Sequence, residues 1–308
     1  MRKNLISLLI VCSALSFINA QPAKEEMSSR GRFYIIGTGP SGPQMATLQA
    51  LETIMKMDAI VASNEHLKLF SDYIKHKPVL FDPWQGLFDY KGKSIHSLNM
   101  QGLFAFMKER LRLVDKRAEQ IKALLAEGKD VGLLDSGNPC LFAPGHWYVE
   151  KFDAQEVVII PGMGSDAAAM AALGKSVIPA YNTRFVIQTS PLLLLNRTLE
   201  DVQALKDLGK YPNTMIQYMA LGRPEKLFEA LSQIYPPDIP CAVVYWAGYP
   251  DQQRIVRGTV ADMGTKLAQE EEKYMGILLI GRFLEGKPYE ASLTPPLLKR
   301  VKKAEASH

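Results

Sequence analysis

The stretch FYIIGTGPSGPQMATLQALE, residues 33–52, has the form of a nucleotide-binding loop. An apolar run leads into Gly37, Gly39 and Gly42, which have the spacing GxGxxG, and a helix-like segment follows. In a dinucleotide fold such glycines let the backbone approach a pyrophosphate at a helix N-terminus. The first chemistry to weigh is therefore phosphate binding.

Two features oppose a pyrophosphate site. Pro40 and Pro43 remove two backbone N–H donors from the loop that would hold the phosphates. The second predicted strand ends at Ser63, where a dinucleotide fold has the acid that binds the ribose. The glycine spacing alone is a weak signal, and these departures favour another ligand.

Small residues, glycine or proline also directly follow apolar runs elsewhere in the chain. The segments are LLDSGNPCLF (133–142), VVIIPGMGSDAAAMAALG (157–174), TMIQYM (214–219) and VVYWAGYPDQQRIVRGTVADM (243–263). In an open α/β sheet the carboxyl ends of the strands line the ligand crevice. Together with the first loop, these joints predict one cleft where five segments converge.

The elements that must position these joints alternate in the way expected of an α/β fold with parallel strands. The predicted strands are 33–37, 59–63, 78–81, 130–135 and 156–162, then 185–190, 214–219, 241–247, 254–260 and 276–283. Residues 104–129 have apolar positions every three to four residues and predict a long amphipathic helix. Because each set carries its own strands and helices, we expect two α/β domains, 32–182 and 183–286, joined after Pro179.

On these motifs the chain resembles the tetrapyrrole methylase family, the methyltransferases of sirohaem and corrin synthesis that use S-adenosylmethionine. The resemblance runs from about Phe33 to Phe283. It is strongest toward the precorrin-4 methyltransferases, through segments 161–174 and 243–263. It implies two α/β domains with the ligand cleft between them, methyl transfer to a ring carbon of a corrin or porphyrin precursor, and a homodimer.

The resemblance also implies which residues contact S-adenosylmethionine. They are Pro40, Ser136, Gly137, Asn138, Leu141, Gly164, Ser165, Met219 and Gly248. Gly42 and Asn138 stand where the family has acids. Ser63 and Pro83 fall at or near the positions of the acid and lysine of the uroporphyrinogen-III methyltransferases, so no catalytic residue carries over.

Taken singly, these residues also have structural interpretations. Gly37, Gly137 and Gly248 suit turns that need positive φ, and Met219 suits a core position at a strand end. Ser165 or the adjacent aspartate is a natural cap for a helix that ends at Gly174. Only the joint occurrence of the motifs favours the functional interpretation.

Composition excludes several other classes. The 308 residues are 47% hydrophobic and 22% charged, which is typical of a globular protein with a sizeable core. A net charge of +4 with no run of five basic residues gives no indication of a nucleic-acid partner. The five histidines lack metal-site spacing. Arg184, Arg223 and Arg254 lie at or near the joints, where they suit either substrate carboxylates or a solvated surface.

The first twenty residues have the pattern of a secretory signal peptide. Arg2 and Lys3 precede an apolar stretch over 5–17, and cleavage is expected after Ala20. The alternative, a membrane anchor, needs about 20 apolar residues. We therefore expect a protein that is periplasmic or otherwise exported, without a stable membrane span after cleavage.

Three further expectations concern the rest of the exported chain. Residues 21–31 form a flexible lead-in and 287–308 a loose tail. Cys140 and Cys241 either pair or stay as buried thiols.

Two functions follow from different classes. The first is an exported methyltransferase acting on a tetrapyrrole. The second is an exported tetrapyrrole-binding protein that keeps the cleft but has lost methyl transfer. A cytoplasmic cofactor and a signal peptide are in conflict, and that conflict keeps the second hypothesis open.

Overall fold

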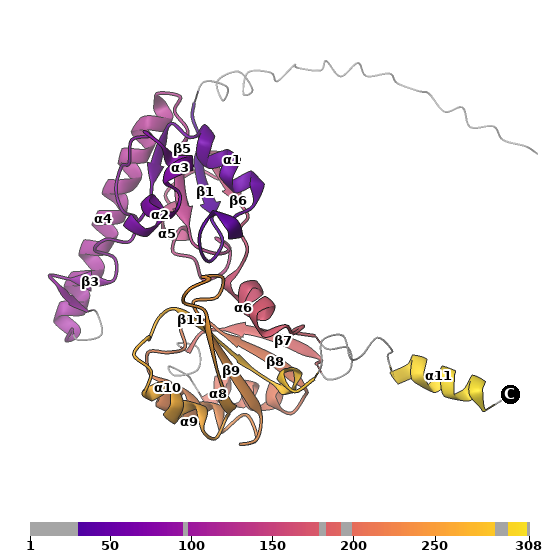
Figure 1. Ribbon diagram of the computed structural model, residues 1–308. Helices are drawn as coiled ribbons and strands as arrows, with labels where there is room; N and C mark the ends of the chain where they lie inside the picture. The colour runs from indigo at the N-terminus through magenta and orange to yellow at the C-terminus, as the bar shows by residue number, and fades with distance from the viewer. Residues whose placement is uncertain (1–29, 95–97, 179–182, 192–198, 287–294, 307–308) are drawn as a thin grey trace, which may run out of the picture.

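A computed structural model describes residues 30–94, 98–178, 183–191, 199–286 and 295–306. The predicted signal peptide and nearly all of the lead-in lie outside these residues. Figure 1 shows two bodies, each built from a sheet and helices, joined through the region of helix α6. The expected pair of α/β domains is confirmed. The boundary at 182–183 stays a prediction, as does the homodimer.

The first sheet is entirely parallel, with strand order β2-β5-β1-β6. Its strands are β1 (Phe33–Gly37), β2 (Ala59–Val61), β5 (Val131–Asp135) and β6 (Val157–Ile160). β1 is central and pairs Phe33 with both Val131 and Val157. Phe33, Ile35 and Ile36 are fully buried, because both faces of the sheet are covered by helices.

Two groups of helices cover this sheet. The elements are η2 (Pro43–Met45), α1 (Leu48–Lys56), α2 (Asn64–Leu69), α3 (Ser71–Ile74), α4 (Met100–Ala126) and α5 (His146–Val149), with a small hairpin of β3 (Asp89–Tyr90) and β4 (Lys93–Ser94). Val114 and Ile121 of α4 pack on the face that holds Phe33. Ile54 of α1 and Ile74 of α3 pack on the opposite face.

The second sheet is mixed, with strand order β10-β9-β11-β8-β7. Its strands are β7 (Phe185–Thr189), β8 (Asn213–Gln217), β9 (Pro240–Tyr245), β10 (Arg254–Thr259) and β11 (Gly276–Ile280). Only β7 and β8 run parallel; the other neighbours are antiparallel. The expectation of parallel strands thus holds for the first sheet and for one pair in the second.

Helices also cover both faces of the second sheet. They are α6 (Ser165–Leu173), α8 (Leu199–Gly209), α9 (Pro224–Leu231), α10 (Met263–Ala268) and η4 (Arg282–Leu284). Leu231 of α9 and Met263 of α10 pack with Val243 on one face. Ala169 of α6 packs with Val244 on the other face, although α6 follows a strand of the first sheet in the chain. Helix α6 therefore links the two bodies.

The structure corrects two local predictions and confirms a third. Residues 78–81 form no strand; a single bridge joins Ile60 to Val79. Pro78, which has no backbone N–H donor, opens this segment, and Pro83 follows two residues after its end. Ser165 is the first residue of α6 and Gly164 its N-cap, without a side-chain cap, whereas Gly174 ends the helix in the left-handed conformation as predicted. The long predicted helix is confirmed as α4, capped by the Oδ1 atom of Asn99 on the amide of Gly102 at 2.8 Å.

The C-terminal segment and the cysteines also differ in part from expectation. Residues Pro295–Glu305 form helix α11 within the segment predicted to be a tail. Prolines at the helix start and the Leu, Lys and Arg that follow favour a helix. Cys140 is exposed and Cys241 buried, and both are free thiols. Among the described residues, no helix is long and apolar enough to cross a membrane.

Arg117 of α4 is buried and ties the loop after residue 81 to the helix. Its guanidinium donates to the carbonyl oxygens of Pro83 and Gln85, at 3.2 and 3.0 Å, and to the hydroxyl of Tyr148 at 3.2 Å. It also lies over the ring of Phe81, 5.0 Å from the centroid. A buried charge held by carbonyls and an aromatic face is costly to leave half satisfied.

Replacing Arg117 by methionine tests this tie. We expect Arg117→Met to lower the free energy of unfolding by about 2–4 kcal/mol, because two buried carbonyls lose charged donors. Lys116→Met, one residue away and exposed, is the control and is expected to change it by less than about 0.5 kcal/mol. Urea denaturation measures both; equal effects would contradict the assignment.

Candidate functional site

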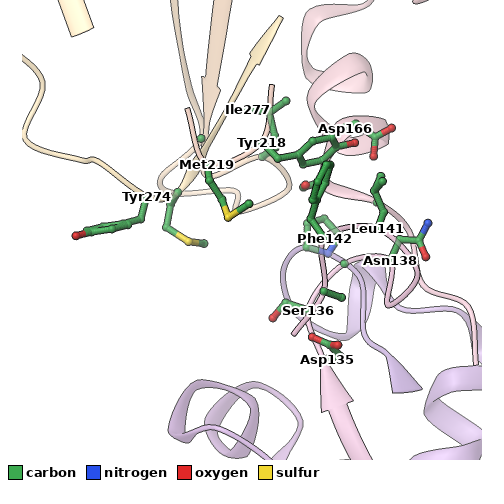
Figure 2. Close-up of a pocket in the computed structure, with 18 of the residues that line it drawn as sticks. Asp135, Ser136, Asn138, Leu141, Phe142, Asp166, Tyr218, Met219, Tyr274 and Ile277 are labelled. Atoms are coloured by element: carbon green, nitrogen blue, oxygen red, sulfur yellow. The ribbon is translucent and has the colours of Figure 1, made fainter. Parts of the chain in front are cut away.

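The cavity lies where strand ends of both sheets converge, and its volume is about 440 Å³. Such a volume is within the usual range for small-molecule sites, roughly 300–1,000 Å³. Figure 2 shows Asp135 and Ser136 at the end of the first sheet and Met219 and Tyr274 across from them on the second. The predicted cleft between two bodies is therefore present.

Three joints of the first sheet touch through bare backbone. The amide of Gly137 donates to the carbonyl of Gly39 at 2.8 Å. A Cβ atom at Gly162 would lie 2.2 Å from the Gly137 oxygen and 2.6 Å from the carbonyl carbon of Gly37. Only glycine permits this approach. The contact fixes the loops after β1, β5 and β6 relative to one another, which places residues 136–138 at the cavity wall.

Eight of the nine residues predicted to contact the cofactor line the cavity. They are Pro40, Ser136, Gly137, Asn138, Leu141, Gly164, Ser165 and Met219. Met219 has φ +56° and a 57% exposed side chain, so its interpretation as a core residue is wrong. Asn138 turns its Oδ1 atom back to the amide of Cys140 at 3.0 Å, which holds the loop in shape.

The ninth residue, Gly248, does not line the cavity. Its carbonyl accepts from the hydroxyl of Ser41 at 3.0 Å, and a Cβ atom there would lie 3.0 Å from the end of the Met45 side chain. Gly248 therefore lies in the contact between the two bodies. Its neighbours in the chain, Ala247 and Tyr249, line the cavity instead. The hydroxyl of Tyr249 donates to Glu65 at 2.8 Å, a second bond across the bodies.

The cavity has an aromatic lining that the sequence analysis missed. The residues are Trp84, Phe88, Phe142, Tyr218, Trp246, Tyr249 and Tyr274. The rings of Phe142 and Tyr218 lie 5.2 Å apart between centroids and come from different sheets. Trp246 and Tyr249 lie within the predicted joint 243–263, and Phe142 and Tyr218 lie within the joints 133–142 and 214–219, so these positions were a usable signal. The remaining three, Trp84, Phe88 and Tyr274, follow from tertiary packing. Flat apolar faces of this kind suit a planar macrocycle or a nucleobase.

Asp135, the last residue of β5, was also missed. Its side chain lines the cavity and is 2% exposed. Its Oδ2 atom accepts from the amide of Gly145 at 3.1 Å. Burial raises the pKa of Asp135 to about 7, and hydrogen bonds from the amides of Gly145 and Ser136 limit the rise. An acid at the carboxyl end of a predicted central strand was a signal that the sequence contained.

His66 of α2 supports the wall behind Ser136. Its Nδ1 atom lies 2.9 Å from the hydroxyl of Ser63, and its Nε2 atom lies 3.1 Å from that of Thr38 and 3.3 Å from that of Ser136. Burial lowers the pKa of His66 to about 4, against the opposing charges of Glu65 and Asp82. The ring is therefore neutral near pH 7, and it orients the hydroxyl of Ser136 at the cavity.

Basic residues stay away from the described part of the cavity wall, which contains no Lys, Arg or His. Arg254 lies over the ring of Tyr245 and pairs with Glu270 at 2.6 Å. Arg184 and Arg223 are exposed and do not line the cavity either. Among the described residues, no group of three or more His, Cys, Asp or Glu side chains could hold a metal ion.

A parallel α/β body, a second mixed sheet and a glycine-built cavity between them define a two-domain methyltransferase that binds S-adenosylmethionine. The model of the tetrapyrrole (corrin/porphyrin) methylases matches residues 32–264. The chain belongs to this family, whose members transfer a methyl group from S-adenosylmethionine to a tetrapyrrole carbon.

Individual relatives agree with this assignment. The cobalt-precorrin-4 C(11)-methyltransferase of Methanocaldococcus jannaschii is 26% identical over 86% of this chain and 93% of its own length. The precorrin-4 C(11)-methyltransferase of a Sinorhizobium species is 30% identical over 62% of this chain and 75% of its own. The structure of the Thermus thermophilus uroporphyrin-III C-methyltransferase, complexed with S-adenosylhomocysteine, has a TM-score of 0.57 at 18% identity. The similarity covers 83% of this chain and 99% of the Thermus thermophilus chain, and shows that the two proteins share a fold.

The residues of this cavity fit S-adenosylmethionine. Backbone groups at Gly137 and Gly164, the apolar side chains of Leu141 and Met219 and the aromatic lining suit an adenosyl group. The absence of cations among the described wall residues suits a positively charged sulfonium. When bound, the cofactor supplies a methyl group that is already activated for transfer. These contacts to the cofactor stay predictions for this chain.

Gly137 offers a direct test of cofactor binding. We expect Gly137→Ala to weaken binding of S-adenosylhomocysteine at least about tenfold, roughly 1.4 kcal/mol, because the new methyl group would project from the cavity wall, 3.9 Å from the Ser165 nitrogen, into space that the cofactor is expected to fill. Gly174→Ala is the matched control. It also has positive φ, +62° against +77°, and open space around it. Isothermal titration gives both affinities. An equal loss in the two variants would show backbone strain and not a cofactor contact.

Proposed function

We propose that this protein methylates a corrin precursor of the precorrin-4 class, at the carbon named C11 in its relatives. The similarity to two precorrin-4 C(11)-methyltransferases over most of their length supports this choice. The observation that carries it concerns two positions beside the cavity, Ser63 and Pro83.

Neither position offers an ionisable group to a uroporphyrinogen. The Ser63 hydroxyl caps α2 at the amide of His66 and also bonds the imidazole. The Pro83 carbonyl accepts from Arg117 and from the hydroxyl of Tyr148 at 2.7 Å. Both positions belong to the frame behind the cavity. Their chemistry favours the corrin branch of the family over the uroporphyrinogen-III branch.

The residues of this chain contribute mainly by positioning. The aromatic lining offers a flat macrocycle apolar faces, and the bonds from Ser41 to Gly248 and from Tyr249 to Glu65 hold the two sides of the cleft together. Holding two reactants in near-attack geometry supplies roughly 7–11 kcal/mol of a barrier. With no basic residue on the described wall, substrate carboxylates would lie at the rim of the cavity and not inside it.

A second function keeps the same cleft. An exported protein that binds a tetrapyrrole without methylating it is favoured by Gly42 and Asn138, which stand where the family has acids. The side chain of Asn138 is engaged with its own loop. This function shares the binding step and differs in the chemistry.

One assay separates the two. Purified protein is incubated with methyl-labelled S-adenosylmethionine and, in parallel, with cobalt-precorrin-4 or uroporphyrinogen III. We expect label in the precorrin product alone. Label in uroporphyrinogen III alone would overturn the proposed substrate class. A shift of the corrin absorbance without any transferred label would support the binding protein.

We also propose that the protein is exported, on the basis of residues 1–20. A reporter that is active only outside the cytoplasm, fused to residues 1–25, is expected to be active. A matched fusion carrying Leu9→Arg in the apolar stretch is expected to be inactive, because a charge there prevents membrane insertion. Cytoplasmic retention of the first fusion would contradict export and leave the methyltransferase with its cofactor.

A further inference from the structure

We propose that the carboxylate of Asp135 accepts the proton that the macrocycle loses after its ring carbon is methylated. The inference rests on the methyl-transfer activity and adds a catalytic residue to it. Neither position that carries the acid or lysine in uroporphyrinogen-III methyltransferases has an ionisable side chain here, so the proton must leave by another route.

The chemistry requires an acceptor. The ring carbon forms a bond to the methyl group, whose bond to sulfur breaks with both electrons remaining on sulfur. The positive charge of the sulfonium thereby passes to the macrocycle. A neutral product forms when a ring N–H or C–H proton leaves, and a carboxylate that takes it becomes a neutral carboxylic acid. The acid returns its proton to water when the product leaves.

Position favours Asp135 for this step. Side chains alternate along β5, so Asp135 points to the same face as Leu133, which packs with Leu87 and Tyr148. Trp84 packs in the same cluster as Leu133, and both Trp84 and Phe88 line the cavity. Figure 2 shows the carboxylate at the foot of the cavity, across from Met219. A flat ring that stacks on these aromatics would lie beside the carboxylate.

The surroundings of the carboxylate suit a base. Gly145 donates to one oxygen, and a Cβ atom at Gly145 would lie only 2.5 Å from it. No ion pair to Asp135 occurs among the described residues. A carboxylate that is buried and unpaired gains from taking up a proton, and with a pKa raised to about 7 it is poised for neutral pH.

Other titratable groups fit the step less well. On the elements packed around Asp135 they are His66, Asp82, Arg117, His146 and Tyr148, and elsewhere on the cavity Asp166, Tyr218, Tyr249 and Tyr274. His66 has its pKa lowered to about 4 and is a weak base. Burial raises the pKa of Tyr218 and Tyr249, which therefore stay protonated. Asp166 accepts from the amide of Gln188 at 3.3 Å and lies on the side of the second sheet.

The test uses Asp135→Asn, which keeps an oxygen for the amide of Gly145 but cannot take the proton. We expect methyl transfer to cobalt-precorrin-4 to fall at least about 100-fold while the affinity for S-adenosylhomocysteine is retained. The wild-type rate is expected to rise as pH rises through about 7, because only the ionised carboxylate is a base. That rise should be absent in Asp135→Asn and present in Asp166→Asn, which changes the other carboxylate of the cavity. Formate should restore part of the rate to Asp135→Ala.

Two readouts do not depend on turnover. Infrared spectra should show a protonated carboxyl band that disappears between pH 6 and 8, and that is missing in Asp135→Asn. Since the folded pKa is raised from the usual 3.8 to about 7, Asp135 lowers the stability of the fold as pH rises from about 3.8 to about 7, and the full loss is present above that range. Asp135→Asn should therefore have a higher Tm than the wild type at pH 8.

The outcomes separate the inference from the proposed function. If wild-type protein transfers methyl groups and Asp135→Asn does so equally with the same pH profile, the inference is wrong and the function stands. If the infrared band is already gone below pH 5, the inference is also wrong. If wild-type protein methylates no tetrapyrrole, both the function and the inference fall.

Discussion

The site depends on a contact between bare backbones. Gly37 ends β1, and Gly137 and Gly162 follow the ends of β5 and β6. Their main-chain atoms lie so close together that a Cβ atom at Gly37 or Gly162 would clash with the neighbouring backbone. Parallel strands place their carboxyl ends at one edge of the sheet. The contact between the glycines therefore fixes the positions of the loops after β1, β5 and β6 relative to one another. The first sheet, the helices on both its faces and the capped start of α4 serve to bring these three glycines together.

The residues around these three glycines have two different roles, according to the chemistry of their side chains. Apolar and aromatic side chains form the cavity wall, whereas hydroxyls and the neutral imidazole of His66 form the frame behind it. Arg117 belongs to that frame as well, since it holds the carbonyls of the loop that carries Trp84. The charge of Arg117 therefore holds the loop that carries Trp84 without lining the cavity itself. Asp135 and Asp166 are the exceptions, two carboxylates placed at the cavity itself.

The strands and the long helix were predictable from periodicity, because each is marked by buried apolar residues at regular spacing. Local pattern did not reveal strand direction in the second sheet, since a buried strand reads the same in either direction. Eight of the nine predicted cofactor positions line the cavity because they sit within glycine-rich joints. Gly248 shows the limit of this reasoning: its joint reaches the cavity, but the glycine itself packs against Met45 and Ser41. Trp84 and Tyr274 were missed because their approach to the cavity is a product of tertiary packing.

The position of helix α6 determines where the chain must bend if the two bodies move relative to each other. It follows β6 of the first sheet after only the segment Pro161–Gly164, yet its buried face belongs to the second sheet. If the two bodies move as units, any change in the width of the cleft must bend the chain within these four residues. The same segment contains Gly164 and leads into Ser165 at the cavity wall. The hinge and the ligand loop are thus one piece of chain, and a ligand that stiffens this loop would also fix the opening of the cleft.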